Sequence, residues 1–218
     1  MKIDIWSDVV CPFCYIAKRH LQQAMEEFPE LEVSISWRSF ELDPKAPKNA
    51  EMGIYDSLAK KYGQNRDWAK QVTRNMLEMA RNAGLEFNME ALKPTNSFDA
   101  HQLLHLAKQE GKQMELKERL FSAYFVEGKH IADHKTLTTL GEQVGLPVDR
   151  IQKTLKEEEF ASAVNHDVMQ AKNIGIEGVP FFLINHKYSL SGAQPVETFI
   201  QLLHQVNEGQ VNINTNAS

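Results

Sequence analysis

Hydrophobic and polar residues alternate in two short stretches near the start of the chain, from Lys2 to Trp6 and from Leu31 to Phe40. A period of two residues predicts β-strands that each have one drier face. Between them, from Tyr15 to Phe28, apolar residues recur at the spacing of a helix. A strand, a helix and a strand in this order predict a right-handed βαβ unit, and the carboxyl ends of its parallel strands form the usual crevice for chemistry.

The middle of the chain, from about residue 51 to about residue 175, has the pattern of one helix after another. Ser97 and Asp133 are predicted N-caps of two of these helices. The segments differ in length and pattern, so they predict a helical domain and not a repeat solenoid. Six glycines each close an apolar segment and predict helix C-termini, namely Gly63, Gly84, Gly111, Gly128, Gly145 and Gly175.

Strand signals return after residue 175. Residues 180–184 form a dense apolar run, Asn185 and His186 predict a two-residue turn, and residues 187–190 pair back as a hairpin. Pro195 then opens a last helix. The apolar stripe of this helix consists of Val196, Phe199, Ile200, Leu203 and Val206.

These elements predict the α/β fold class, with one discontinuous domain formed by both ends of the chain. We expect this domain to comprise residues 1–48 and 168–210, and an all-helical insertion to occupy residues 49–167. Residues 211–218 are polar and rich in asparagine, which predicts a disordered tail. In this arrangement the inserted helices overhang the carboxyl ends of the strands and wall a cleft there.

Composition narrows the class of protein. Of 218 residues, 42% are hydrophobic and 24% are charged, which is ordinary globular usage, and no apolar run approaches the length of a membrane span. The net charge of −5 argues against nucleic acid as a partner. Asp4 and Asp8 interrupt the N-terminal apolar stretch where an export signal needs an unbroken core, so we expect a cytoplasmic protein without a membrane partner.

The two cysteines of the chain lie in the segment Cys11-Pro12-Phe13-Cys14, between the first strand and the first helix. Pro12 is tolerated at the first helical position, which makes Cys11 the predicted N-cap and puts Cys14 one turn further on the same side. Because the helix N-terminus stabilises an anion, we expect Cys11 to be the nucleophilic thiolate and Cys14 the resolving thiol. Pro12 and Phe13 support this site. In a reducing compartment such a pair is catalytic or metal-binding more often than structural.

Glu41 follows the second predicted strand, at the same end of the sheet as the cysteines. It is a candidate proton acceptor or relay for them, and a solvated surface glutamate is the alternative.

Two histidine pairs, His101 with His105 and His130 with His134, have a spacing that would suit zinc together with the cysteines. A zinc site would require the cysteines and a distant helix to converge, so we expect no metal. His101 is instead a candidate wall of the cleft near the thiols, with ordinary packing as the alternative.

Several motifs connect these features. They are Ser7-Asp8-x-x-Cys11-Pro12-Phe13-Cys14-Tyr15, Thr95-Asn96-Ser97-Phe98-Asp99-Ala100-His101, Ala123-Tyr124-Phe125-x-Glu127-Gly128, Gly178-Val179-Pro180-Phe181-Phe182 and Ser191-Gly192-Ala193-Gln194-Pro195. Together they resemble the DsbA-like thioredoxin proteins of the FrnE group over almost the whole chain. The resemblance implies a thioredoxin-like domain with a large helical insertion, and thiol-disulfide oxidoreductase activity.

The same resemblance implies a cis peptide bond before Pro180, facing the cysteine pair, which leaves the backbone of Val179 free to pair with a bound peptide. One departure is visible after Gly128. Relatives tend to carry an acid where this chain has His130, with Asp133 still present. The charge of this loop, and with it the substrate preference, is therefore open.

The leading hypothesis is an enzyme that exchanges thiols and disulfides with a protein or small-molecule substrate, without a bound cofactor, and is recycled by glutathione or a thioredoxin-type partner. An alternative is a glutathione-dependent isomerase or transferase, because 2-hydroxychromene-2-carboxylate isomerases and kappa-class glutathione transferases share the split fold. Those enzymes typically have a serine at the position of Cys11. A non-enzymatic binding module is the third reading, and the direction of exchange is not encoded in any motif.

Overall fold

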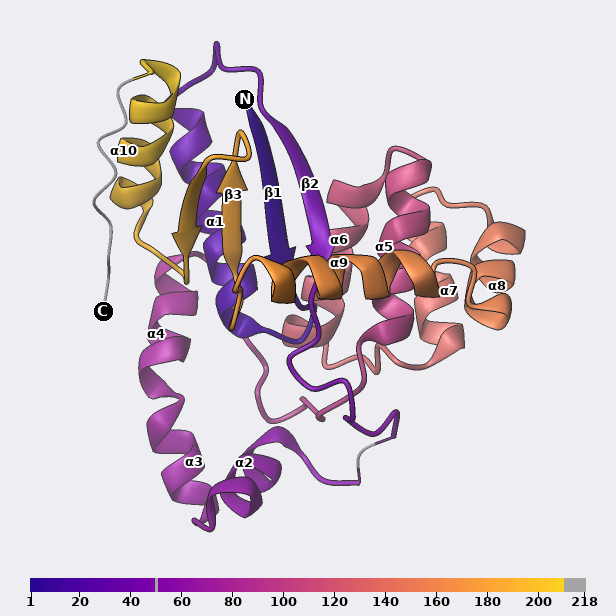
Figure 1. Cartoon of the computed structure of the whole chain (residues 1–218). Coiled ribbons are helices and arrows are strands. Elements are labelled where there is room, and N and C mark those ends of the chain that lie inside the picture. The colour runs from indigo at the N-terminus through magenta and orange to yellow at the C-terminus, as the bar shows by residue number, and fades with distance from the viewer. Residues whose placement is uncertain (50, 210–218) are drawn as a thin grey trace.

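The computed structural model describes residues 1–49 and 51–209, so the expected tail at 211–218 lies outside the described residues. Four strands form one mixed sheet in the order β2-β1-β3-β4 (Figure 1). Strands β1 and β2 are parallel, as the predicted βαβ unit requires, and β3 runs antiparallel to both β1 and β4. The strands are β1 Lys2–Ser7, β2 Ser34–Ser39, β3 Phe181–Ile184 and β4 Tyr188–Ser191.

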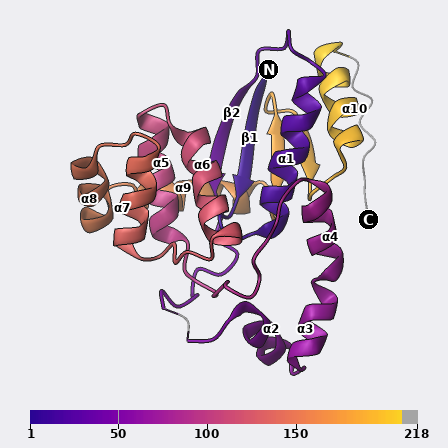
Figure 2. The same ribbon diagram turned by 180° about the vertical axis from the view of Figure 1, so that it is seen from behind.

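Helix α1 (Pro12–Glu26) connects β1 to β2 and packs beside α10 (Val196–Asn207), the last helix. Figures 1 and 2 show both helices on one face of the sheet. The turn between β3 and β4 is the predicted one, because Asn185 and His186 both take positive φ, 49° and 56°. The core between the sheet and these helices contains Ile3, Ile5, Ala17, Leu21, Phe182, Phe199 and Leu203.

The inserted segment is helical, as predicted, and all six glycines expected at helix ends take positive φ. Figures 1 and 2 show α2–α4 on one side of the molecule and α5–α8 on the other. The expected domain boundary between residues 167 and 168 falls inside a continuous helix, α9. The helices are α2 Ile54–Tyr62, α3 Arg66–Val72, α4 Arg74–Asn82, α5 Phe98–Gln109, α6 Gln113–Phe121, the π-helix η1 Ser122–Val126, α7 His134–Gln143, α8 Val148–Glu157 and α9 Ala161–Asn173.

Helix α1 belongs to two cores at once. Its residues Ala17, Leu21 and Ala24 face the sheet, whereas Cys14 and Tyr15 lie in the larger core of the inserted helices. The ring of Tyr15 stacks on that of Phe121 from α6, with 4.8 Å between ring centroids and 10° between planes. Lys18 Nζ of α1 lies 2.6 Å from Glu118 Oε2 of α6. The cysteine pair therefore sits where the two parts of the molecule meet.

Asp167 attaches α9 to the sheet. Its carboxylate accepts hydrogen bonds from Arg38 Nη1 at 3.2 Å and from the Ser39 backbone N–H at 3.0 Å, both from β2. Its backbone carbonyl accepts from Trp6 Nε1 at 3.1 Å. Arg38 is itself fixed by Asp4 of β1, whose carboxylate lies 2.9 Å from Arg38 Nε. A buried carboxylate thus ties the last inserted helix to both parallel strands.

Within residues 1–49 and 51–209, no helix has the length and apolar character needed to cross a membrane.

Candidate active site

Cys11 is the N-cap of α1 and Pro12 is its first residue, as the sequence predicts. The Cys11 backbone N–H donates to the Asp8 carbonyl at 3.2 Å, and the Cys14 N–H donates to the Cys11 carbonyl at 3.1 Å. Both cysteines are free thiols, and their side chains approach to 3.4 Å. Cys11 exposes 3% of its surface and Cys14 exposes 1%. A dithiol at this separation needs only a small movement to close as a disulfide.

The loop before β3 faces the pair. The Val179-Pro180 peptide bond is cis, as the resemblance implies. The Cys11 sulfur lies 3.6 Å from the carbonyl oxygen of Val179. A cavity of about 430 Å³ lies along this loop and is lined by residues 175–181 together with Ser191 and Gly192. Phe13, between the cysteines, is 40% exposed. The loop before β3 and the exposed ring of Phe13 therefore lie next to the dithiol.

The pKa values of the two thiols depend on each other, because the thiols are hydrogen-bonded to each other. The hydrogen bond with Cys14, together with burial, raises the pKa of Cys11 well above its usual range. For Cys14, burial raises the pKa, but the hydrogen bonds with Cys11 and Ser7, and after them the positive charge of Lys117, outweigh it, so its pKa is lowered. The pair therefore loses its first proton more easily than an isolated thiol and its second less easily.

The hydrogen bond between the thiols opposes the effect of the helix N-terminus expected at Cys11, whose role as the resting thiolate stays a prediction. The helix N-terminus does act on Cys11, because the backbone N–H of Cys14 lowers the pKa of its sulfur. The negative charge of Asp8 acts in the opposite direction. The sequence places Cys11 at the helix end correctly, but it does not reveal the groups that surround Cys14.

Asp8 and His101 form a buried pair under the cysteine loop, with 3.4 Å between Asp8 Oδ1 and His101 Nε2. The Leu42 backbone N–H donates to Asp8 Oδ2 at 2.8 Å. Burial raises the pKa of Asp8, but the hydrogen bond and charge of His101 and the Leu42 N–H bring it below the usual range. The pKa of His101 is lowered because burial outweighs the attraction of Asp8. His101, expected as a cleft wall near the thiols, is 1% exposed and makes its polar contact with Asp8.

Glu41 lies just beyond β2, at the expected end of the sheet, and is half-buried. Burial, and after it the negative charge of Asp8, raises the pKa of this carboxyl. A carboxyl of raised pKa near the cysteine loop suits proton exchange. A proton-relay role for Glu41 therefore stays a prediction.

Lys117 of α6 was not singled out from the sequence, although it is fully buried, with its Nζ over the rings of Trp37 and Phe121. Among the residues that the structure describes, its ammonium has no hydrogen-bond acceptor. A signal was present, because Lys117 occupies the apolar face of its helix. That face contains Leu116, Leu120 and Phe121, which are all fully buried.

The histidines expected as zinc candidates have other partners. His105 Nε2 lies 3.3 Å from Asp167 Oδ2, His134 Nε2 lies 2.9 Å from Asp99 Oδ2, and His130 contacts the Lys48 carbonyl. In the part of the chain that the structure describes, no three His, Cys, Asp or Glu side chains are grouped to hold a metal ion.

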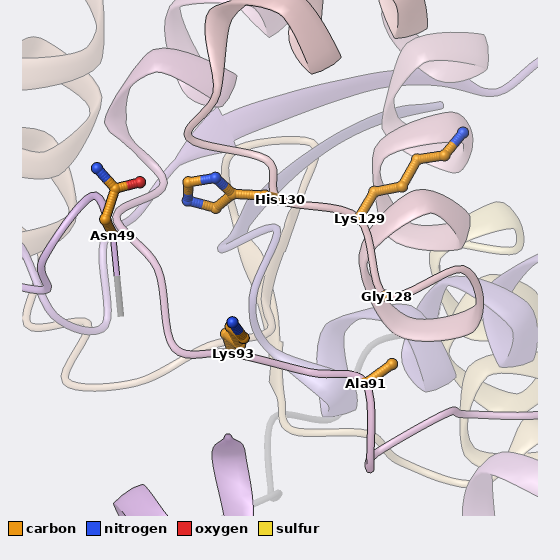
Figure 3. Close-up of a pocket in the computed structure, with 6 residues that line it drawn as sticks. All are labelled: Asn49, Ala91, Lys93, Gly128, Lys129 and His130. Carbon is orange, nitrogen blue, oxygen red and sulfur yellow. The ribbon is translucent and has the colours of Figure 1, made fainter. Parts of the chain in front are cut away.

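His130 lines a separate cavity of about 380 Å³. Figure 3 shows the side chain of Lys129 extending away from His130, and Lys129 Nζ lies 2.7 Å from Glu127 Oε2. Neither cysteine is among the residues that line this cavity, which are Asn49, Ala91, Lys93, Gly128, Lys129 and His130. A role of His130 in substrate preference stays a prediction.

A parallel βαβ unit, a dithiol at the start of its helix and a cis-proline loop facing that dithiol together define a thioredoxin-type domain, here interrupted by helices. The family model of the DsbA-like thioredoxin domain matches residues 2–204, and the chain belongs to this family. Its members are oxidoreductases or isomerases, so an enzymatic role is established at that level.

Individual relatives agree with this assignment. A probable DsbA oxidoreductase from Streptomyces coelicolor is 32% identical, with a TM-score of 0.90 over 99% of this chain and 93% of its own. The protein YwbO of Bacillus subtilis, described as uncharacterized, is 29% identical over 84% of this chain and 86% of its own. DsbM from Pseudomonas aeruginosa, described as a cytosolic disulfide reductase and solved with GSH, shares the fold at 18% identity, with a TM-score of 0.67 over 95% of this chain and 100% of its own.

Proposed function

We propose that this protein exchanges thiols and disulfides, with Cys11 as the nucleophile and Cys14 as the resolving thiol. The observation that carries the proposal is the placement of the Cys11 sulfur between the Cys14 side chain, at 3.4 Å, and the Val179 carbonyl, at 3.6 Å. A substrate disulfide that enters along the loop before β3 meets Cys11 first, because it is the Cys11 sulfur that contacts Val179 of this loop, while Cys14 is 1% exposed and one helical turn further on.

The hydrogen bond between the thiols supplies the first proton step. The step starts with Cys14 as the thiolate of the pair: as Cys11 attacks, its proton passes to the Cys14 sulfur, a bond forms between Cys11 and one substrate sulfur, and the substrate disulfide breaks. The released substrate thiolate takes a proton from water. Cys14 then attacks the Cys11 sulfur of the mixed disulfide, and its proton passes to the second substrate sulfur as that sulfur leaves. The second substrate sulfur leaves as a thiol, so the substrate is reduced and the cysteine pair is oxidised.

The reverse sequence would oxidise a substrate dithiol, and the potential of the pair against its surroundings decides the direction. We further propose a cytoplasmic location with glutathione as the reductant of the Cys11–Cys14 disulfide. The description of DsbM as cytosolic and its crystallisation with GSH support this choice. The exposed ring of Phe13 between the cysteines offers an apolar contact to a protein or small-molecule disulfide.

The test is a pair of single-cysteine variants challenged with a disulfide-containing protein. Cys14→Ser should accumulate mixed disulfides through Cys11, because the resolving sulfur is gone. Cys11→Ser should accumulate none. Non-reducing electrophoresis, with and without later addition of a thiol, measures both. Trapping by Cys11→Ser alone would reverse the assigned roles.

Equilibration of the reduced protein with glutathione separates this function from a glutathione-dependent isomerase or transferase. We expect the mass of the protein to show loss of both thiol hydrogens as the disulfide closes. If no intramolecular disulfide forms at any ratio of oxidised to reduced glutathione, the exchange proposal fails and the isomerase or transferase gains support.

A further inference from the structure

The cavity of about 430 Å³ along the loop before β3 is lined largely by backbone. Three of its lining residues are glycines, and at Gly178 an added Cβ would meet open space. The backbone of the loop is therefore accessible to a polypeptide segment. The lining residues are Gly175, Ile176, Glu177, Gly178, Val179, Pro180, Phe181, Ser191 and Gly192.

This cavity adjoins the dithiol through Val179. Val179 lines the cavity, and its carbonyl oxygen lies 3.6 Å from the Cys11 sulfur. The next carbonyl, that of Pro180, accepts a hydrogen bond from the Gly192 backbone N–H at 2.8 Å, which fixes the loop to the end of β4. When a substrate disulfide reacts at Cys11, the residues beside its cysteine therefore lie near the cavity.

Glu177 gives this cavity a charge. It is exposed, and it is the only ionisable residue among the described residues that line the cavity. The next cation along the chain toward the N-terminus is Lys172, in the last turn of α9. Among the residues that the structure describes, neither Glu177 nor Lys172 belongs to an ion pair. The Glu177 carboxylate is therefore available to a cation that a substrate supplies.

We propose that Glu177 is a specificity-determining residue that favours polypeptide disulfides with lysine or arginine beside the reacting cysteine. The inference deepens the proposed function, on which it rests, by naming the class of substrate. A basic side chain that enters the cavity is attracted by the Glu177 carboxylate, and an acidic side chain is repelled by it. The effect of Glu177 on the rate therefore depends on the charge of the substrate.

The experiment uses three peptides that differ only in the residues on both sides of a single cysteine, which are lysine, alanine or glutamate. Each cysteine forms a mixed disulfide with a chromophoric aromatic thiol. When Cys11 of the reduced protein attacks the peptide sulfur, the aromatic thiolate leaves, and its absorbance gives the second-order rate constant. We expect the lysine peptide to react fastest and the glutamate peptide slowest, with roughly two- to fivefold between successive peptides, as for an exposed ion pair.

Glu177→Gln keeps the size of the side chain and removes its charge. The ratio of the lysine-peptide rate to the glutamate-peptide rate should fall by roughly fivefold, because one attraction and one repulsion are both lost. Glu177→Lys should invert the preference. A change of overall activity cancels in this ratio. The same ratio in the wild type and in Glu177→Gln would overturn the proposal.

Glu157→Gln is the matched control, because it changes the net charge equally at an exposed glutamate of α8. Figures 1 and 2 show α8 at the far end of the molecule from β3. This variant should keep the wild-type ratio, and an equal fall in both variants would overturn the assignment to Glu177. If the wild type does not react even with the alanine peptide, the exchange function itself fails and this inference with it. Equal rates for all three peptides overturn this inference alone.

Discussion

At the scale of single residues, the buried histidine beneath the cysteine loop gives the protein a dependence on pH. His101 is paired with Asp8 and is almost completely buried. Burial lowers the pKa of His101 in the folded state below the ordinary histidine value near 6.5. As the pH falls through about 6.5, the unfolded chain binds a proton that the folded protein does not, so the free energy of unfolding decreases.

We therefore predict that His101→Gln flattens the dependence of stability on pH between about pH 7 and pH 5, because glutamine does not titrate and can still donate to Asp8. Denaturant unfolding at a series of pH values measures it. His166→Gln, at an exposed site on α9, is the control and should keep the wild-type slope. An unchanged slope in His101→Gln would show that another group causes the acid sensitivity.

The sequence was sufficient to predict the positions of residues that depend only on their neighbours in the chain. Cys11 at the N-cap and Pro12 at the first helical position follow from the order of strand, proline and helix. Lys117 is different, because its burial depends on α6 packing against α1, and the Lys18–Glu118 pair that joins these helices spans 100 residues of the chain. The same holds for the balance of charge between the two thiols. Local pattern cannot supply contacts of this kind.

At the scale of elements, two glycines at helix ends differ in what surrounds them. Gly63, after α2, has φ of 63° and open space where a Cβ would point. Gly128, after η1, has φ of 64°, but a Cβ there would lie 2.4 Å from the Cβ of Ala91. The first glycine is needed for its backbone conformation only, and the second is needed for close approach as well.

We predict that Gly63→Ala lowers the free energy of unfolding by roughly 1 to 2 kcal/mol, the cost of a left-handed conformation. Gly128→Ala should cost about 1 to 3 kcal/mol more, because the loop at Ala91 must move. Chemical denaturation of the two variants gives the difference, in which the backbone cost common to both cancels. Equal losses would mean that the loop yields without cost.

The six helix ends predicted from glycines were correct, because a left-handed residue at the end of a helix is a local requirement that glycine meets. The strands and the hairpin also follow from local alternation and turn residues. The π-helix at Ser122–Val126 was not predicted, since its residues Ala123, Tyr124 and Phe125 are all buried and match an ordinary apolar helix. A widened turn depends on how those side chains pack and leaves no mark in the hydrophobic period.

At the scale of the whole molecule, the shared helix α1 couples the two cores. One face of α1 belongs to the core at the sheet, and Tyr15 belongs to the aromatic stack with Phe121 in the inserted helices. Asp167 forms a second link through Arg38 and Ser39. The sequence predicts a split domain with an insertion, but the sharing of one helix between both parts follows only from their packing.

We predict that the two parts unfold in one cooperative transition, because neither core is complete without α1. In a Trp68→Phe background, which removes the tryptophan of α3, the fluorescence of Trp6 and Trp37 reports mainly on the sheet and its neighbours, and far-ultraviolet circular dichroism reports mainly on the many helices. Coincident denaturation midpoints from both signals are expected. Separate midpoints would show that the inserted helices fold independently of the sheet.

The near-complete burial of the two thiols limits how far an oxidant can oxidise them. A thiolate that meets a peroxide becomes a sulfenic acid, and further oxidation to sulfinic or sulfonic acid is irreversible in nearly all proteins. Cys11 exposes only 3% of its surface, while Cys14 lies 3.4 Å away. A sulfenic acid at Cys11 therefore meets the neighbouring thiol before a second oxidant and condenses with it, releasing water. Oxidative damage at this site then ends in a disulfide that a thiol reduces, and the protein recovers without being made again.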